Sequence, residues 1–306
     1  MRIIVGSRAS RLALIQADWV VEQLRQFCPE SEIAIKKIKT KGDAILDSPL
    51  AKIGGKGLFV KEIEDALLNK EIDLAVHSMK DVPTDLPGGL TIGAVTERLE
   101  PRDVLISKDK CKLNELSPGS LIGTSSPRRK AQLLAYRGDL EVVDLRGNLN
   151  TRLKKLETTG LSAIVVAGAG LIRMGLRDRI AQTFPTEIML PAPGQGALGI
   201  EIRDGDEEIR ALVSNLNEPD SLAAIIAERA FLNALGGGCQ VPIGALGKVE
   251  GKTLRLQGVV ASLDGTRLLR SKVKGHKEEA EEIGKDLAKI LINLGAGEIL
   301  AHDGQY

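Results

Sequence analysis

The feature that most constrains the fold is a series of short apolar runs, each ending in a polar turn before a helical pattern. Two such turns are alike: Gly6-Ser7-Arg8-Ala9-Ser10 follows the apolar run 2–5, and Gly123-Thr124-Ser125-Ser126-Pro127 follows a second run. Strands that alternate with helices are typical of α/β folds. We therefore expect two α/β halves of similar design, each with a helix N-terminus directed toward a shared cleft.

Periodicity and the positions of glycine and proline place the other elements. We predict strands over 33–38, 72–77, 90–95, 104–107, 140–145, 163–167 and 198–202, and helices over 58–68, 127–136, from about 151, and over 221–235. In the first helix the expected apolar stripe is Leu12, Ile15, Trp19, Leu24 and Phe27. Its N-cap is expected at Ser7 or Ser10.

The pattern changes after Gly244. Short strands are expected at 254–256, 258–262 and 268–273, with a hairpin turn at Asp264-Gly265. An amphipathic helix follows over 280–290. The end of the chain therefore predicts a small α+β domain with an antiparallel sheet.

Composition narrows the class of function. The 306 residues suffice for two or three domains, and 43% of them are apolar. Lys plus Arg is 42 and Asp plus Glu is 41, and only four Phe, two Tyr and one Trp occur, which disfavours nucleic-acid binding. No signal pattern, membrane span or metal-ligand spacing is apparent. We expect a cytoplasmic protein with no membrane partner, no disulfide framework and no metal site.

Arginine placement is the most informative charge feature. Six arginines fall at or just after predicted strand ends, beside glycine or hydroxyl residues: Arg8, Arg128, Arg129, Arg146, Arg152 and Arg173. Ligands of open α/β sheets bind beyond the carboxyl ends of strands, and arginine recognises carboxylate or phosphate with two parallel bonds. Any one of these arginines could be a solvated surface residue. The whole set favours a small polyanionic ligand.

Asp81 stands at the end of a predicted buried strand, in the run His77-Ser78-Met79-Lys80-Asp81. A carboxylate there, beside Lys80 and facing arginines, can stay ionised and stabilise a developing cation or move a proton. The alternative is a helix N-cap or a turn residue. His77 has no second histidine nearby, since His276 and His302 are remote, and a structural role suits it better.

Cys239 follows the glycines Gly236, Gly237 and Gly238 and precedes Pro242. The glycines end the preceding helix and allow a ligand or another stretch of backbone to approach the thiol. Cys239 could therefore be a nucleophile or a covalent anchor. A small buried cysteine in a glycine turn is the other interpretation. Upstream, the irregular stretch 41–57 lacks a phosphate-loop signature and is expected to form a flap.

Five motifs along nearly the whole chain resemble the porphobilinogen deaminases, also called hydroxymethylbilane synthases. They are Gly54-Gly55-Lys56-Gly57-Leu58-Phe59, His77-Ser78-Met79-Lys80-Asp81-Val82-Pro83, Gly123 through Arg129, Leu145-Arg146-Gly147-Asn148, and Gly237-Gly238-Cys239-Gln240-Val241-Pro242. Gly236 departs from the glutamate that often precedes the Gly-Gly-Cys of this family.

The resemblance implies two α/β domains like the halves of a periplasmic binding protein, over 1–96 with 197–214 and over 102–190. It also implies a C-terminal α+β domain over 219–306. It implies a dipyrromethane cofactor joined to Cys239 through a thioether. The implied reaction, part of tetrapyrrole biosynthesis, joins four porphobilinogen molecules head to tail with loss of ammonia. Water then releases hydroxymethylbilane.

The resemblance also implies roles for individual residues. It assigns the catalytic role to Asp81. The chain is expected to act as a monomer, with hinges near 96–102 and 191–195. Cofactor binding falls to Lys80, Ser78, Thr124, Ser126, Arg128, Arg129 and Arg146, and substrate binding to Arg8, Ser10, Arg152, Arg173 and Gln195. Lys52, Lys56 and Phe59 belong to the expected flap.

Two other functions fit parts of the sequence. A two-lobed binding protein for a polycarboxylate ligand, without catalysis, would account for the α/β halves and the arginines. It would leave Cys239 and Asp81 without a role. An RNA-binding domain that uses the arginine-rich helix starts would require steep salt dependence of its affinity.

Overall fold

The structure is a computed structural model that describes residues 1–44, 60–237 and 241–303. The chain divides into two compact units, one formed by Met1–Leu99 with Gly196–Leu222 and the other by Glu100–Gln195 with Ala223–Tyr306. Two of the three boundaries, after Leu99 and after Gln195, fall at the segments that were predicted as hinges. The finer division into three domains stays a prediction.

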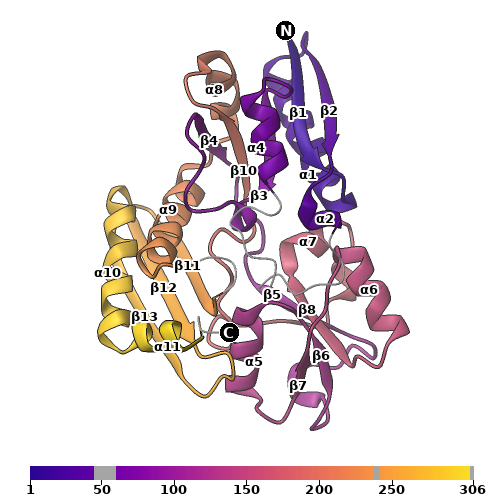
Figure 1. The fold of residues 1–306 in the computed structure, drawn as a ribbon, viewed down its shortest axis with the longest axis vertical. Coiled ribbons are helices and arrows are strands. Elements are labelled where there is room, and N and C mark those ends of the chain that lie inside the picture. The colour runs from indigo at the N-terminus through magenta and orange to yellow at the C-terminus, as the bar shows by residue number, and fades with distance from the viewer. Residues whose placement is uncertain (45–59, 238–240, 304–306) are drawn as a thin grey trace. The chain divides into compact units, whose positions relative to one another are not determined.

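The first unit contains a five-stranded sheet with the order β2-β1-β3-β10-β4 (Figure 1). Its strands are β1 (Arg2–Arg8), β2 (Glu32–Ile38), β3 (Leu74–Ser78), β4 (Leu90–Val95) and β10 (Leu198–Arg203). β1 pairs in parallel with β2 and β3, whereas β10 is antiparallel to both of its neighbours. Helices α1 (Arg11–Phe27) and α8 (Glu207–Val213) share a core with one face, and α4 (Lys61–Leu68) covers the other.

The side chains of β1 explain why it lies inside the sheet. Ile3 and Val5 join the core beneath α1, and Ile4 packs against the core beneath α4, so consecutive residues are apolar. The predicted stripe of α1 was wrong in part. Trp19 is 40% exposed and Phe27 is 50% exposed, because the buried stripe runs instead through Gln16, Ala17, Val20, Val21 and Leu24.

The second unit contains a sheet with the order β7-β6-β8-β5-β9. Its strands are β5 (Asp103–Ser107), β6 (Leu121–Gly123), β7 (Glu141–Val143), β8 (Ala163–Ala167) and β9 (Gln182–Thr183), and its helices are α5 (Pro127–Tyr136), α6 (Leu149–Thr158) and α7 (Gly168–Arg173). β6 lies between two parallel partners, and β5 is antiparallel to β8. The two sheets therefore share one design, with the antiparallel strand at the same place, which confirms the prediction of two similar halves.

The same unit also carries a three-stranded antiparallel sheet in the order β11-β12-β13. The strands are β11 (Ile243–Glu250), β12 (Thr253–Ala261) and β13 (Leu268–His276). Figure 1 shows α9 (Pro219–Ala234), α10 (Ala280–Asn293) and α11 (Ala296–Asp303) gathered about this sheet. The fold class predicted from the sequence is confirmed.

Glycines account for two errors in the strands that the sequence predicted for this small sheet. β11 was not predicted, and β12 was divided wrongly into two strands. A β-carbon on Gly247 would lie 3.0 Å from the backbone of Ala224, and one on Gly258 would lie 2.7 Å from the Phe231 ring. Glycine in these strands therefore permits α9 to approach the sheet, rather than interrupting the strands.

Short helical segments complete the described elements. They are α2 (Lys41–Ala44) and the 3₁₀ turns Met79–Asp81, Leu113–Glu115, Arg177–Arg179, Ser214–Leu216 and Lys277–Glu279. Across residues 1–44, 60–237 and 241–303, no helix combines the length and apolar content that crossing a bilayer requires.

A buried carboxylate, Asp103, joins three parts of the second unit. Asp103 begins β5 and is 0% exposed. Arg128 Nη1 donates to one of its oxygens at 2.7 Å, and Arg129 Nε and Nη2 donate to the other at 3.0 and 2.7 Å. Gln195 Nε2 donates to the same carboxylate at 3.0 Å. Burial alone would raise the pKa of Asp103, but the charges of Arg128 and Arg129 outweigh it and hold the pKa well below its usual range.

We predict that Asp103→Asn lowers the free energy of unfolding by about 3–5 kcal/mol, because it leaves two buried guanidinium groups without their anion. Urea unfolding followed by circular dichroism measures the effect. The matched control is Asp139→Asn, which breaks the exposed ion pair with Arg137 and should leave the unfolding midpoint unchanged. Equal midpoints for the two variants would contradict this account of Asp103.

Candidate functional site

The predicted residues of the first unit lie at the carboxyl ends of its parallel strands. Arg8 is the last residue of β1, and Ser78 is the last residue of β3. Ser10 is the N-cap of α1, where its hydroxyl oxygen accepts from the Ala13 N–H at 3.3 Å, so one of the two expected caps is confirmed. Lys80 and Asp81 follow Ser78 on the 3₁₀ turn Met79–Asp81.

Three contacts fix the turn that carries Asp81. The Met79 N–H donates to the Ala197 carbonyl at 3.0 Å, and the Met79 side chain is 2% exposed. A β-carbon on Gly199 would lie 2.7 Å from Met79 Sδ, so glycine on β10 makes room for this side chain. Asp81 itself is only partly buried. The turn is therefore anchored by its first residue, while its acidic end stays accessible.

Gln16 is the third anchor, and the sequence analysis missed it. Its Nε2 lies 3.1 Å from Ser78 Oγ, and its side chain is 4% exposed on α1. Helical spacing could have indicated that Gln16 is buried, because it lies one turn before Val20 on the buried stripe. A buried amide needs a hydrogen-bond partner, and the Ser78 hydroxyl supplies it.

In the second unit the loops after β6 and β7 are joined by hydrogen bonds. The Thr124 N–H donates to the Val143 carbonyl at 2.9 Å, and Ser125 Oγ donates to the Leu145 carbonyl at 3.0 Å. The Ser126 N–H donates to Thr124 Oγ1 at 3.2 Å. Pro127 then opens α5 in its first turn, as predicted. These bonds place Thr124 and Ser126 at the N-terminus of a helix, where anions are favoured.

Three further arginines follow β7 and β8 at the same edge. Arg146 is half-buried and has neither a hydrogen bond nor an ion pair with any residue that the structure describes. Arg152 Nε donates to the Gly147 carbonyl at 2.8 Å. Burial lowers the pKa of Arg173 to about 10, so this guanidinium remains charged near neutrality. We call Thr124, Ser126, Arg146, Arg152 and Arg173 the cationic edge.

Arg128, Arg129 and Gln195 stand apart from the cationic edge. All three are at most 5% exposed, and all three bind Asp103. Gln195 Nε2 donates also to the Pro101 carbonyl at 2.7 Å. Nε and Nη2 of Arg128 have no partner within the described ranges. Two guanidinium charges against one carboxylate leave a buried excess of one positive charge.

Cys239 and the expected flap residues Lys52, Lys56 and Phe59 lie outside the described residues. The chain leading to Cys239 is described. The Gly237 N–H donates to the Leu232 carbonyl at 3.0 Å, and the Gly236 N–H donates to the Asn233 carbonyl at 2.9 Å. Gly236 has φ +65°, so α9 ends in a Schellman motif. The prediction that the glycines terminate the helix is confirmed.

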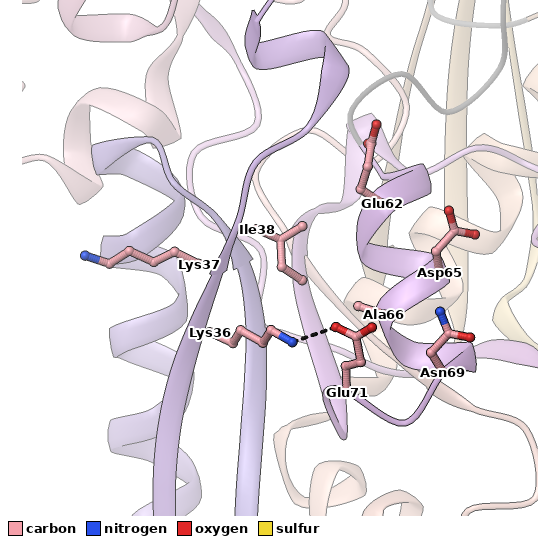
Figure 2. Close-up of a pocket in the computed structure, with 8 residues that line it drawn as sticks. All are labelled: Lys36, Lys37, Ile38, Glu62, Asp65, Ala66, Asn69 and Glu71. Atoms are coloured by element: carbon pink, nitrogen blue, oxygen red, sulfur yellow. Dashed lines mark hydrogen bonds and ion pairs between the residues drawn. The ribbon is translucent and has the colours of Figure 1, made fainter.

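A hollow lies elsewhere in the first unit, between β2 and α4. It has a volume of about 400 Å³ and is lined by residues of both charges, among them Lys36, Lys37, Glu62 and Glu71. Figure 2 shows Lys36 and Glu71 pointing toward one another, with Nζ and Oε2 2.6 Å apart. This pairing leaves no cationic excess, so the hollow does not suit a polyanion. No cluster of three or more metal-ligating side chains occurs among the described residues.

Comparison with known proteins covers almost the whole chain. A model of the porphobilinogen deaminase dipyromethane cofactor binding domain matches residues 3–211, and a model of the porphobilinogen deaminase C-terminal domain matches residues 222–293. Porphobilinogen deaminase of Pelotomaculum thermopropionicum is 57% identical over 97% of this chain and 96% of that protein. Its counterpart in Desulforudis audaxviator is 54% identical over 98% of this chain and 97% of that protein.

Among solved structures, the periplasmic aliphatic sulphonate binding protein SsuA from Escherichia coli matches with 12% identity and a TM-score of 0.42. The match covers 76% of this chain and 70% of that one. The matched family models span residues 3–211 and 222–293, and both are models of the same enzyme. The chain therefore belongs to the porphobilinogen deaminase family.

Proposed function

We propose that this chain is a hydroxymethylbilane synthase: it joins four porphobilinogen molecules head to tail, releases ammonia at each step, and yields hydroxymethylbilane for tetrapyrrole synthesis. The cationic edge is the observation that carries the proposal. Each pyrrole of the product bears an acetate and a propionate, so the growing chain is the kind of small polyanion that this edge suits. The relatives named porphobilinogen deaminase support the same assignment.

The residues of the second unit fit a dipyrromethane cofactor. Its carboxylates need cationic or hydroxyl donors, and Arg146, together with Nε and Nη2 of Arg128, has no protein partner within the described residues. Arg129, Ser126 and Thr124 complete the proposed cofactor-binding set. Lys80 and Ser78 are also proposed to bind the cofactor. When bound through Cys239, the cofactor supplies the nucleophilic pyrrole carbon that begins the chain.

The remaining chemistry falls to the side chains of the protein. Arg8, Ser10, Arg152 and Arg173 are proposed to orient the carboxylates of the incoming porphobilinogen. Loss of the substrate's amino group leaves an electron-poor cation, and the Asp81 carboxylate can stabilise it electrostatically. Asp81 can also accept and return a proton as the new carbon–carbon bond forms. Gln195 is proposed as a substrate-side residue, and its amide nitrogen already binds Pro101 and Asp103.

Location and assembly are part of the proposal. A thioether requires a reduced Cys239, and both described cysteines, Cys28 and Cys111, are free thiols. This favours the reducing cytoplasm. We propose a monomer that binds no nucleic acid, because the net charge is close to zero and aromatic residues are scarce. The non-catalytic binding protein stays the alternative.

We predict that Cys239→Ser yields a folded chain without a covalent cofactor. Intact-mass measurement of the wild-type chain should give a mass above the sequence mass by one two-pyrrole unit, and the variant should give the sequence mass alone. Incubation of the wild type with porphobilinogen should then add discrete single-pyrrole increments. A wild-type chain at its sequence mass that binds porphobilinogen without consuming it would favour the binding protein.

We predict that Asp81→Asn reduces kcat for porphobilinogen consumption by roughly 10²–10⁴-fold, because the amide cannot accept a proton or oppose the cation with a full charge. Asp85→Asn is the matched control. It removes an exposed carboxylate four residues away and should retain wild-type kcat. Near-normal turnover by Asp81→Asn, with an unchanged circular dichroism spectrum, would remove Asp81 from the mechanism.

We predict that Arg146→Leu lowers cofactor loading or the rate of chain growth by roughly 10–100-fold, because a bound carboxylate loses a charge-assisted hydrogen bond. Intact mass reports loading, and the spacing of mass increments reports growth. Arg255→Leu, which removes an exposed arginine from β12, controls for loss of charge. If both variants load and elongate like the wild type, Arg146 does not hold a carboxylate.

A further inference from the structure

A buried set of titratable groups lies directly behind the turn that carries Asp81. His77 on β3, Glu201 on β10 and Glu64 on α4 are 4%, 0% and 6% exposed. His77 Nε2 lies 2.9 Å from Glu201 Oε2. Neither the proposed mechanism nor the family motifs use the two glutamates. Charged groups this deeply buried need a partner or a proton.

The register of the sheet explains how the set comes together. His77 pairs with Gly199, and Glu201 pairs with Ala75, so both side chains lie on the face of the sheet that α4 covers. Glu64 projects from α4 into the buried side of that helix, beside Ile63 and Leu67. Three elements thus bring one imidazole and two carboxyl groups to one place.

The charges of the set do not balance if both carboxyl groups ionise. Oε1 of Glu64 and Oε1 of Glu201 are buried and have no hydrogen-bond partner among the described residues. Burial, together with the charge of Glu201, raises the pKa of Glu64 to about 7, although His77 opposes the shift. A proton on Glu64 would leave the imidazole of His77 with one carboxylate to balance instead of two.

Charges on the elements packed against this set are few, and they are held elsewhere or oppose one another. β4 has no titratable side chain, and the arginines of β1, Arg2 and Arg8, are its first and last residues. On β10, Arg203 is held by Asp73 and Asp206. The remaining charges near Glu64 are its own helix neighbours, Asp65, which raises the pKa of Glu64, and Lys61, which lowers it.

We propose that His77 and Glu201 are positioning residues for Asp81. Of the two buried glutamates, Glu201 carries the negative charge and Glu64 holds a proton. This inference rests on the proposed function. His77 immediately precedes Ser78 and Met79, the residues that anchor the turn to Gln16 and to β10. The ion pair fixes His77 to β10, and Asp81 is only four residues further along the chain. A small displacement of a catalytic group is costly to the rate.

Matched isosteric variants test which of the two glutamates, Glu201 or Glu64, carries the negative charge. Glu201→Gln should lower kcat for porphobilinogen consumption about tenfold or more, with KM changed far less, because Asp81 loses its position while the proposed substrate-binding arginines keep theirs. Glu64→Gln mimics the protonated side chain and should retain kcat below pH 7. Glu22→Gln, an exposed change on α1, controls for the substitution itself.

The pH dependence of stability provides a second readout. The folded protein binds a proton at Glu64 that the unfolded chain releases at the ordinary glutamate pKa of 4.5. The thermal midpoint of the wild type should therefore fall as pH rises from about 5 through about 7, relative to Glu64→Gln. The difference between the two midpoints should be small at pH 5 and largest at pH 8.

Each outcome has a defined meaning. Wild-type kcat in Glu201→Gln, equal losses in the two variants, or parallel midpoints from pH 5 to 8 would each overturn the inference. Intact mass separates these results from failure of the proposed function. Every variant should carry the same covalent two-pyrrole unit as the wild type, whereas a wild type that lacks it and forms no hydroxymethylbilane would refute the proposed function itself.

Discussion

The buried carboxylate of Asp103 is the constraint on which the second unit depends. It begins the strand by which the chain enters this unit, and it binds Gln195 where the chain leaves. It also holds Arg128 and Arg129 in the first turn of α5. Burying one anion between two cations limits the electrostatic cost and leaves one positive charge in excess. A carboxylate bound at the cationic edge would balance that excess. Burial of Arg128 and Arg129 is therefore compatible with their proposed role toward an anionic cofactor.

The two similar sheets explain why both units present a polar edge beyond their parallel strands. β10 and β5 each run antiparallel in the fourth position of their sheet, and the parallel strands beside them end at one edge. Loops at the carboxyl ends of parallel strands are the usual ligand sites of open α/β sheets. In the first unit this edge presents an acid and two basic residues, Asp81, Lys80 and Arg8. In the second unit it presents the cationic edge.

Local sequence patterns were enough to predict the features that depend on neighbouring residues. The bounds of β4 and β8, the Ser10 cap and the glycine stop after α9 follow from propensity and spacing, and all were predicted. The same reasoning failed where distant contacts decide. Trp19 looks like a core residue by its chemistry, yet the tertiary packing of α1 buries Gln16 instead. β11 was missed because Gly244 and Gly247 serve close packing against residues far along the chain.

The site could be predicted as a set of residue types, but not as a set of partners. Arginines after strand ends indicate an anion, whereas nothing near Arg128 in the sequence identifies Asp103 as its counterion. His77 was assigned a structural role because no second histidine is near it. Glu201 is 124 residues away, and sheet register alone brings it to 2.9 Å. Ion pairs between remote elements carry no periodic signal, so they have to be read from the fold.

The two units neutralise buried acids by different means, and the difference matters for the chemistry at each edge. Asp103 is paired with two permanent cations, so its charge is fixed and its surroundings stay positive at any pH near neutrality. The two glutamates behind Asp81 share a single basic side chain within the buried set, that of His77. One of the two acids must then take up a proton to avoid a buried negative excess. A polyanion requires a constant positive field where it is held. Behind Asp81, near-neutrality is preferable, because a buried negative excess there would repel the carboxylate of this proposed catalytic residue.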